Sequence, residues 1–400
     1  MRLVFLFMVL IVGGYVSAQV ETKTTSDTIR QEDNLMKEDA EAPMESLEEE
    51  ESVPTRTRSQ KKKAAQAKLV MKSEVSAQPP VPAAEMQQKS LEFNATRGDA
   101  SNQRTQRTPT PEQQMEMDNA VRYFEQNAPD AFEYHYFKYM SGNYDLDLAG
   151  HLEKAESIKP NNSDVHVQMA AVSIIKNNIA EALRYMNRLV ESERLSASVL
   201  QYSEDVLLSA PDSSVLITHG FDDTYGTWYQ QNANGVRKDV SLVSLDFIQS
   251  EDYREQIKNK GVNVPTRETV DVAFLEEFVD QNQDETVCIS MTTPKEYLVP
   301  LKDNLYVNGL VLEYSKDAID NMESNEVLWN STLSKHLVNG AKDDKARSLS
   351  SNYLPMLFTL RQYYILQNNN KMVVQIDTVI NHLAIQSGKK EQAKKLLKAY

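Results

Sequence analysis

The chain has 400 residues, of which 40% are hydrophobic and 25% are charged, which is enough for about two ordinary domains. With 58 acidic and 43 basic residues, its formal charge of -15 gives a nucleic-acid partner no electrostatic support. A single cysteine excludes an intramolecular disulfide framework and a metal site built from clustered cysteines.

The first 18 residues have the pattern of a secretory signal peptide. Arg2 precedes an uncharged apolar run of 14 residues, Leu3 to Val16, and the small residues Ser17 and Ala18 follow it. This run is shorter than the roughly 20 apolar residues that span a bilayer, so cleavage after Ala18 is favoured over a retained anchor, and both stay open. We therefore expect an exported chain, periplasmic or extracellular, without a membrane span once the signal is cleaved.

Residues 19–110 predict a disordered tether of mixed charge. They contain one aromatic residue, Phe93, and six of the 14 prolines, and an acidic block over 45–51 is followed by a basic block over 56–63. Such a composition buries too little apolar surface to offset the entropy of the chain. Because this segment holds 16 acidic and 14 basic residues, the acidic excess of the chain belongs to residues 111–400.

Residues 111–210 predict a helical repeat domain. Apolar residues at helical spacing run from 134 to 140, a turn follows at Gly142, and a second helix is expected over 146–158. The pattern returns 35 residues later around a turn at Asn177. This spacing resembles the tetratricopeptide period of about 34 residues, with a plain helical bundle as the alternative.

Residues 211–316 change to short apolar runs bounded by turns, which predict strands at 214–218, 240–245, 286–291 and 305–314. Helices are expected between the first three, over 251–258 and 270–279 among others. Residues 317–400 are again helical, with helices over 352–366, 372–385 and 391–400. The sequence thus predicts a mixed fold class, in which tetratricopeptide-like repeats flank a small α/β domain with a mainly parallel sheet.

Two stretches of the α/β part carry a family resemblance: VLITHGFDDTYGTWY over 215–229 and GVRKDVSLVSL over 235–245. Together with 305–314 and 321–330, they are similar to the extracytoplasmic C-terminal region of a bacterial family of multi-spanning membrane proteins. That family belongs to the glycosyltransferase C superfamily and is linked to protein O-glycosylation. The order and spacing agree over roughly 200–390, which implies tetratricopeptide-like helices beside an α/β domain.

The sequence departs from that family in two respects. No apolar run after the signal reaches the length of a membrane span, so the transmembrane half in which glycosyl transfer would occur has no counterpart here. After the first strand, the family pattern Thr-Asn-Gly-Asp-Asn-Asp-Thr-Phe keeps its threonines, glycine and second aspartate, but His219, Phe221 and Asp222 differ. The resemblance therefore implies a fold and a compartment, and not an activity.

The loop after the first strand is the candidate ligand site, because open α/β sheets bind ligands at the carboxyl ends of their parallel strands. Two carboxylates beside two aromatic residues would suit a sugar or a peptide, and the candidates are His219, Asp222, Asp223, Trp228 and Tyr229. Alternatively, Asp223 caps the following helix, Asp222 is solvated and Trp228 packs on the sheet.

No nucleophile elbow, histidine metal spacing or glycine-rich phosphate loop appears in the sequence, so we expect no cofactor, no metal and no catalytic residue. Our hypothesis is an exported, non-catalytic interaction protein, or scaffold, with a protein partner in the cell envelope. The alternative is a glycan-binding or carbohydrate-active protein that uses the loop at 219–223. Binding is favoured over hydrolysis, because adjacent carboxylates seldom reach the separation of roughly 5 to 9 Å that glycoside cleavage needs.

Overall fold

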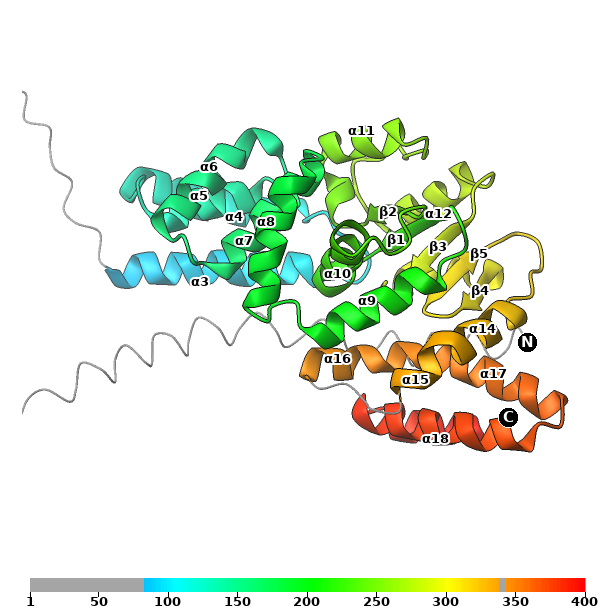
Figure 1. Cartoon of the computed structure of the whole chain (residues 1–400). Helices are drawn as coiled ribbons and strands as arrows, with labels where there is room; N and C mark the ends of the chain where they lie inside the picture. The colour runs from blue at the N-terminus through cyan, green and yellow to red at the C-terminus, as the bar shows by residue number, and fades with distance from the viewer. Residues whose placement is uncertain (1–82, 338–342, 400) are drawn as a thin grey trace, which may run out of the picture. The chain divides into compact units, whose positions relative to one another are not determined.

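The computed structural model describes residues 83–337 and 343–399 (Figure 1). The predicted signal peptide at 1–18 and the tether segment 19–82 lie outside the described residues. The described part consists of an array of paired helices, a five-stranded sheet and a C-terminal group of helices, which confirms the mixed fold class. Within these two ranges, no helix is both long and apolar enough to cross a membrane.

The prediction that 19–110 has no fold is wrong for the part that the structure describes. α3 (Ala83–Ser101) is a 19-residue helix, and it packs with α4 (Pro111–Asn127) and α5 (Phe132–Ser141). Phe93 of α3 is 1% exposed and stacks on Phe137 with the ring centroids 4.1 Å apart. The one aromatic side chain of this polar segment thus helps to anchor it, since burying a phenylalanine contributes roughly 1.5–3 kcal/mol.

The paired helices follow the predicted period. α5 pairs with α6 (Ala149–Ile158), and α7 (Ser163–Ile175) pairs with α8 (Ile179–Glu191). The turns lie at Gly142 and Asn177, as the spacing predicts, and Asn177 adopts a left-handed φ of 54°, which asparagine tolerates better than most residues. Asparagines also cap α7 and α8, because the side chains of Asn162 and Asn178 accept bonds from backbone N–H groups of the first turn.

The sheet has the strand order β2-β1-β3-β5-β4. Its parallel part is formed by β1 (Val215–Thr218), β2 (Ser241–Ser244) and β3 (Val287–Ser290), as the sequence predicts. The prediction of one strand over 305–314 is wrong, because Gly309 at φ 58° turns the chain into an antiparallel hairpin, β4 (Leu305–Asn308) and β5 (Val311–Tyr314). The complete sheet is therefore mixed.

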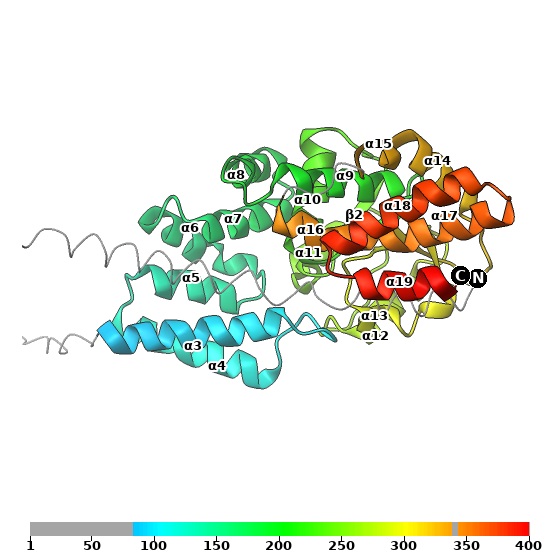
Figure 2. The ribbon, with the colours of Figure 1, turned by 90° about the horizontal axis from the view of Figure 1, so that it is seen from below.

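Helices cover both faces of the sheet and continue to the end of the described chain. α10 (Gly220–Ala233) and α12 (Val272–Gln281) lie on opposite faces (Figure 2). The other helices of this half are α9 (Ala197–Ser209), α11 (Glu251–Asn259), α13 (Lys295–Leu298), α14 (Met322–Leu328), α15 (Ser334–His336), α16 (Asp344–Leu349), α17 (Leu354–Leu366), α18 (Asn370–Gln386) and α19 (Lys390–Ala399). One continuous apolar core extends from α5 through the sheet to α19.

The connection between α3 and α4, residues 102–110, crosses to the sheet half of the molecule. Gln106 forms an antiparallel bridge with Asp271, and the N–H of Arg107 donates to the carbonyl of Val270 at 2.7 Å. The N–H of Val270 in turn donates to Thr108 Oγ1 at 3.0 Å. We call 102–110 the strap; it places Arg107 beside Asp246, which follows the parallel strand β2.

Candidate functional site

Four of the five predicted site residues lie on one helix and His219 directly precedes it, but the five do not face one site. His219 precedes the first turn of α10, which begins at Gly220, so the expected loop at 219–223 is mostly helix. Asp222 pairs with Lys345 of α16 at 3.1 Å, and the Tyr229 hydroxyl donates to Asn187 of α8 at 3.0 Å. Because successive helical residues point about 100° apart, adjacent carboxylates on this helix diverge.

Asp223 is directed into the protein at the carboxyl ends of β1 and β3. Its side chain is buried, and Oδ2 accepts bonds from the N–H of His219 at 3.0 Å and from Thr292 Oγ1 at 2.9 Å. Burial raises the pKa of Asp223 to about 6. His219 is the N-cap of α10 and makes no side-chain cap bond, so Asp223 is not the cap that the alternative expects; its carboxylate instead accepts the backbone N–H of the N-cap residue.

A buried ion pair fills the neighbouring strand ends. Asp246 follows β2 and accepts from the N–H of Gly220 at 2.8 Å, while Arg107 of the strap lies 2.7 Å from its other oxygen. Burial alone would raise the pKa of Asp246, but the Arg107 guanidinium, His219 and the N–H of Gly220 together outweigh it and hold that pKa below its ordinary value. Burial and then the Arg107 charge lower the pKa of His219 to about 4, which keeps the imidazole neutral at pH 7. The strand ends are thus occupied by the protein's own groups.

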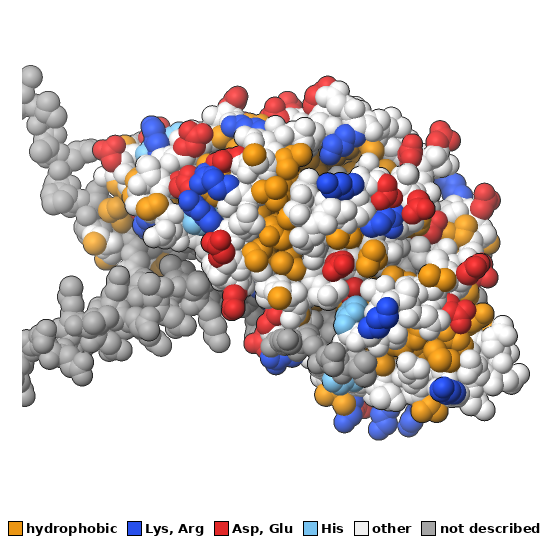
Figure 3. Space-filling view, in the orientation of Figure 1, with side chains coloured by type: hydrophobic (Ala, Val, Ile, Leu, Met, Phe, Trp, Pro, Cys, Tyr) orange, Lys and Arg blue, Asp and Glu red, His pale blue; other side chains and the backbone are white. Residues whose placement is uncertain are grey.

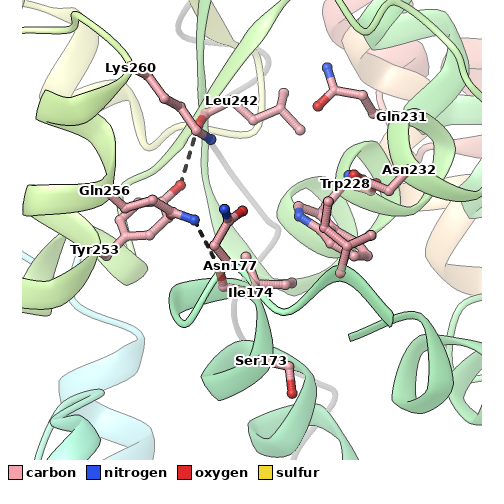
Figure 4. Close-up of a pocket in the computed structure, with 11 residues that line it drawn as sticks. Ser173, Ile174, Asn177, Trp228, Gln231, Asn232, Leu242, Tyr253, Gln256 and Lys260 are labelled. Atoms are coloured by element: carbon pink, nitrogen blue, oxygen red, sulfur yellow. Dashed lines mark hydrogen bonds between the residues drawn. The ribbon is translucent and has the colours of Figure 1, made fainter. Parts of the chain in front are cut away.

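The fifth candidate, Trp228, faces a different place, a cavity of about 150 Å³ that we call the Trp228 pocket (Figure 4). Its walls come from α7 and the turn to α8, from α10, from β2 and from α11, and its lining residues are Ser173, Ile174, Asn177, Ile179, Trp228, Gln231, Asn232, Leu242, Tyr253, Gln256 and Lys260. Hydrophobic side chains form a band between α8 and α10 on this face (Figure 3). The pocket thus joins the helical array to the sheet half.

The pocket has an apolar floor and a polar rim. Ile174, Leu242 and Tyr253 are buried, whereas Asn177 and Lys260 are exposed. Gln256 donates through Nε2 to the carbonyl of Ile174 at 3.3 Å, and its Oε1 is buried without a hydrogen-bond partner in the described part of the chain. Trp228 is half-buried and lies across the cavity from Gln256 in Figure 4.

Sequence reasoning found Trp228 but missed the residues that face it. Asn177 and Gln256 lie far from Trp228 in the sequence, and their residue types are ordinary at a turn and on a helix surface. Arg107 was missed for another reason, because its polar segment resembles a tether. Only the packing of α11 against α7 and of α10 against α8 brings Asn177, Gln256 and Trp228 together.

Replacing Asp223 by Asn is expected to change the pH dependence of stability. The folded pKa of about 6 lies above the ordinary value of 3.8, so the native carboxyl stabilises the fold at low pH and loses that advantage as the pH rises. The free energy of unfolding of the Asn variant, relative to the native chain, should therefore rise by about 2 kcal/mol between pH 4 and pH 6. Urea unfolding across this range measures the difference; a constant difference would show that Asp223 titrates normally.

A comparison with protein-family models finds a match to the second half of the chain. Residues 199–399 match the family model TMEM260-associated domain 2, a range that begins in α9 and ends in α19. TMEM260 is an O-mannosyltransferase family of the glycosyltransferase C type, so the match agrees with the glycosyltransferase C part of the resemblance. Neither a curated protein nor a solved structure matches the chain. Since the matched range covers just over half of its residues, the chain belongs to the TMEM260-associated domain 2 family.

Proposed function

We propose that this chain is an exported, non-catalytic partner-binding protein that works beside protein O-glycosylation in the cell envelope. In this proposal it corresponds to the extracytoplasmic C-terminal region of a membrane-bound glycosyltransferase. The family match to an O-mannosyltransferase supports the link to glycosylation. The observation that carries the binding role is the Trp228 pocket, because two different parts of the chain build it.

The family domain contributes only part of the pocket. Trp228, Gln256 and Lys260 lie within the matched range 199–399, whereas Ile174 and Asn177 belong to the helical array that precedes it. Direct bonds hold the two sides in place: Gln256 reaches Ile174, and the Tyr225 hydroxyl donates to the carbonyl of Val167 at 3.2 Å. A partner that enters the pocket would touch both sides at once.

The positions of the two candidate carboxylates argue against glycoside hydrolysis. Asp223 is 1% exposed and bonded within the fold, and Asp222 is paired with Lys345. A general acid and a nucleophile must both reach the same glycosidic bond, which two carboxylates directed into different surroundings do not do. The non-catalytic proposal therefore takes the pocket, and not the aspartates, as the place of recognition.

A photoreactive amino acid at Ile179 should crosslink a specific partner in intact cells. Ile179 is 47% exposed at the rim of the pocket, so its side chain can be replaced without opening the core. Leu91 on α3 is 57% exposed and is the matched control away from the pocket. We expect an adduct of defined mass from position 179 that is absent from position 91. Identical adduct patterns at both positions, or none at 179, would contradict a recognition surface at the pocket.

A further inference from the structure

The volume of the Trp228 pocket limits its ligand to one ring. About 150 Å³ is the size of an apolar cavity that holds a single benzene molecule, and it is below the 300–1,000 Å³ typical of pockets for larger ligands. We propose that the pocket binds one neutral pyranose unit of a glycosylated partner, an inference that rests on the proposed partner-binding function. Further sugar units of a glycan would lie outside, over the exposed rim at Asn177 and Ile179.

Trp228 provides the surface that a sugar ring requires. A pyranose has a face of C–H groups, which packs against a flat aromatic ring through dispersion and release of water. The indole of Trp228 is half-buried, so one part is fixed by the core and another part faces the pocket. Ile174 and Leu242 continue the apolar surface at the floor.

The polar residues of the lining match hydroxyl groups. Four carboxamide side chains surround the cavity, those of Asn177, Gln231, Asn232 and Gln256. Each carboxamide both donates and accepts, as a sugar hydroxyl does. Three of them are already oriented by bonds to backbone carbonyls: Gln231 donates to Val240 at 2.8 Å, Asn232 to Trp228 at 2.9 Å and Gln256 to Ile174 at 3.3 Å.

Gln256 brings a partly buried carboxamide to the lining, and its bond to Ile174 fixes the orientation of that side chain. The pocket lining has one cationic side chain, the exposed Lys260, and no carboxylate, which favours a neutral sugar over a charged one.

Fluorescence of the full chain tests the proposal. The chain has two tryptophans, and Trp329 is 1% exposed in the core, so Trp329→Phe leaves Trp228 as the only indole. Methyl α-D-mannopyranoside, the glucoside and the galactoside are titrated separately, with mannitol as an acyclic polyol. We expect a saturable change of emission with at least one pyranoside, at a dissociation constant on the order of 1 mM, and none with mannitol.

Substitutions inside and beside the pocket test whether pyranoside binding depends on the pocket. Each is made in the chain that keeps Trp329, and binding of the pyranoside is followed by saturation-transfer NMR. Trp228→Ala should abolish the signal, and Gln256→Leu should weaken binding about tenfold through the loss of one hydrogen bond. Tyr229→Ala is the matched control, because Tyr229 neighbours Trp228 but bonds Asn187 away from the pocket. Thermal unfolding confirms that each variant is folded.

Several results would overturn the proposal. The first is the absence of a saturable response to any pyranoside. The second is a loss of pyranoside binding in Tyr229→Ala as large as in Trp228→Ala. The third is a proline-rich peptide that occupies the pocket at a lower concentration than every sugar. If crosslinking at Ile179 succeeds while sugars fail, the partner-binding function stands and only the sugar assignment falls. If sugars bind while no partner is crosslinked, the pocket is a sugar site and the proposed partner function falls.

Discussion

Replacing Arg107 by Met should lower the free energy of unfolding by about 3–5 kcal/mol, the largest effect of any single substitution that we expect. The side chains of Arg107 and Asp246 are only 9% and 12% exposed, and they lie 2.7 Å apart. The substitution keeps the apolar stem and leaves the Asp246 carboxylate buried without its cation. Urea unfolding at pH 7 measures the loss.

Arg104 provides the matched control. It lies on the same strap and pairs with Glu296 at 2.9 Å, but the two side chains are 36% and 27% exposed. Solvent screening limits such a pair to about 1 kcal/mol or less, so Arg104→Met should cost far less than Arg107→Met. Adding Asp246→Asn to Arg107→Met should recover much of the loss. Equal costs at positions 104 and 107 would contradict the role of burial.

This ion pair has a consequence for the family domain. Arg107 lies outside the matched range 199–399, whereas Asp246 lies within it, directly after β2. The strap therefore completes the carboxyl edge of the sheet in this chain. Arg107 and Asp246 thus lie at the position where open α/β sheets usually bind ligands, whereas the Trp228 pocket lies elsewhere, between the helical array and the sheet half.

The second large loss in the free energy of unfolding is expected for Asp205→Ala in α9. Asp205 is fully buried, and its Oδ2 accepts from the Tyr353 hydroxyl at 2.6 Å and from His336 Nε2 at 2.7 Å. Its removal leaves two donors from the C-terminal helices without an acceptor, at a cost of about 2–4 kcal/mol. Hydrogen exchange should become faster in α15, α16 and α17 in particular. Tyr353→Phe, which removes one donor and keeps the carboxylate, should cost about 1 kcal/mol.

The same group makes stability depend on pH. The hydrogen bond to Asp205 raises the pKa of His336, so its stabilising contribution is complete below the ordinary pKa of 6.5 and is lost as the pH rises through the folded value. Asp205→Ala should remove this part of the pH dependence. A variant whose stability still falls above pH 6.5 as in the native chain would contradict the assignment to this pair.

Local patterns in the sequence predicted most of the helices and strands, but they missed α3 and the hairpin of β4 and β5. The turns at Gly142 and Asn177 and the three parallel strands could be predicted, because helical and strand periodicities differ over short windows. The hairpin at Gly309 was missed because a single glycine within an apolar run indicates either a kinked strand or a turn. α3 was missed because composition averages over the one buried aromatic residue, Phe93.

The candidate site was predicted only in part, for a geometric reason. Sequence proximity placed Asp222, Asp223 and Trp228 in one site, yet residues on one helix face different sides according to their angular separation. Trp228 does line a pocket, but Asn177 and Gln256, which line it too, come from the turn after α7 and from α11. Contacts between distant segments carry no local signal in one sequence.

Hydrogen–deuterium exchange of the full chain tests most directly whether recognition takes place where the helical array meets the family domain. The measurement compares the chain alone with the chain saturated by the tightest-binding of the three methyl hexopyranosides. We expect the backbone amides to exchange more slowly over 173–179, 228–232 and 253–260, the segments that line the Trp228 pocket. Protection confined to 219–223 or to the C-terminal helices, with no change at these three segments, would contradict it.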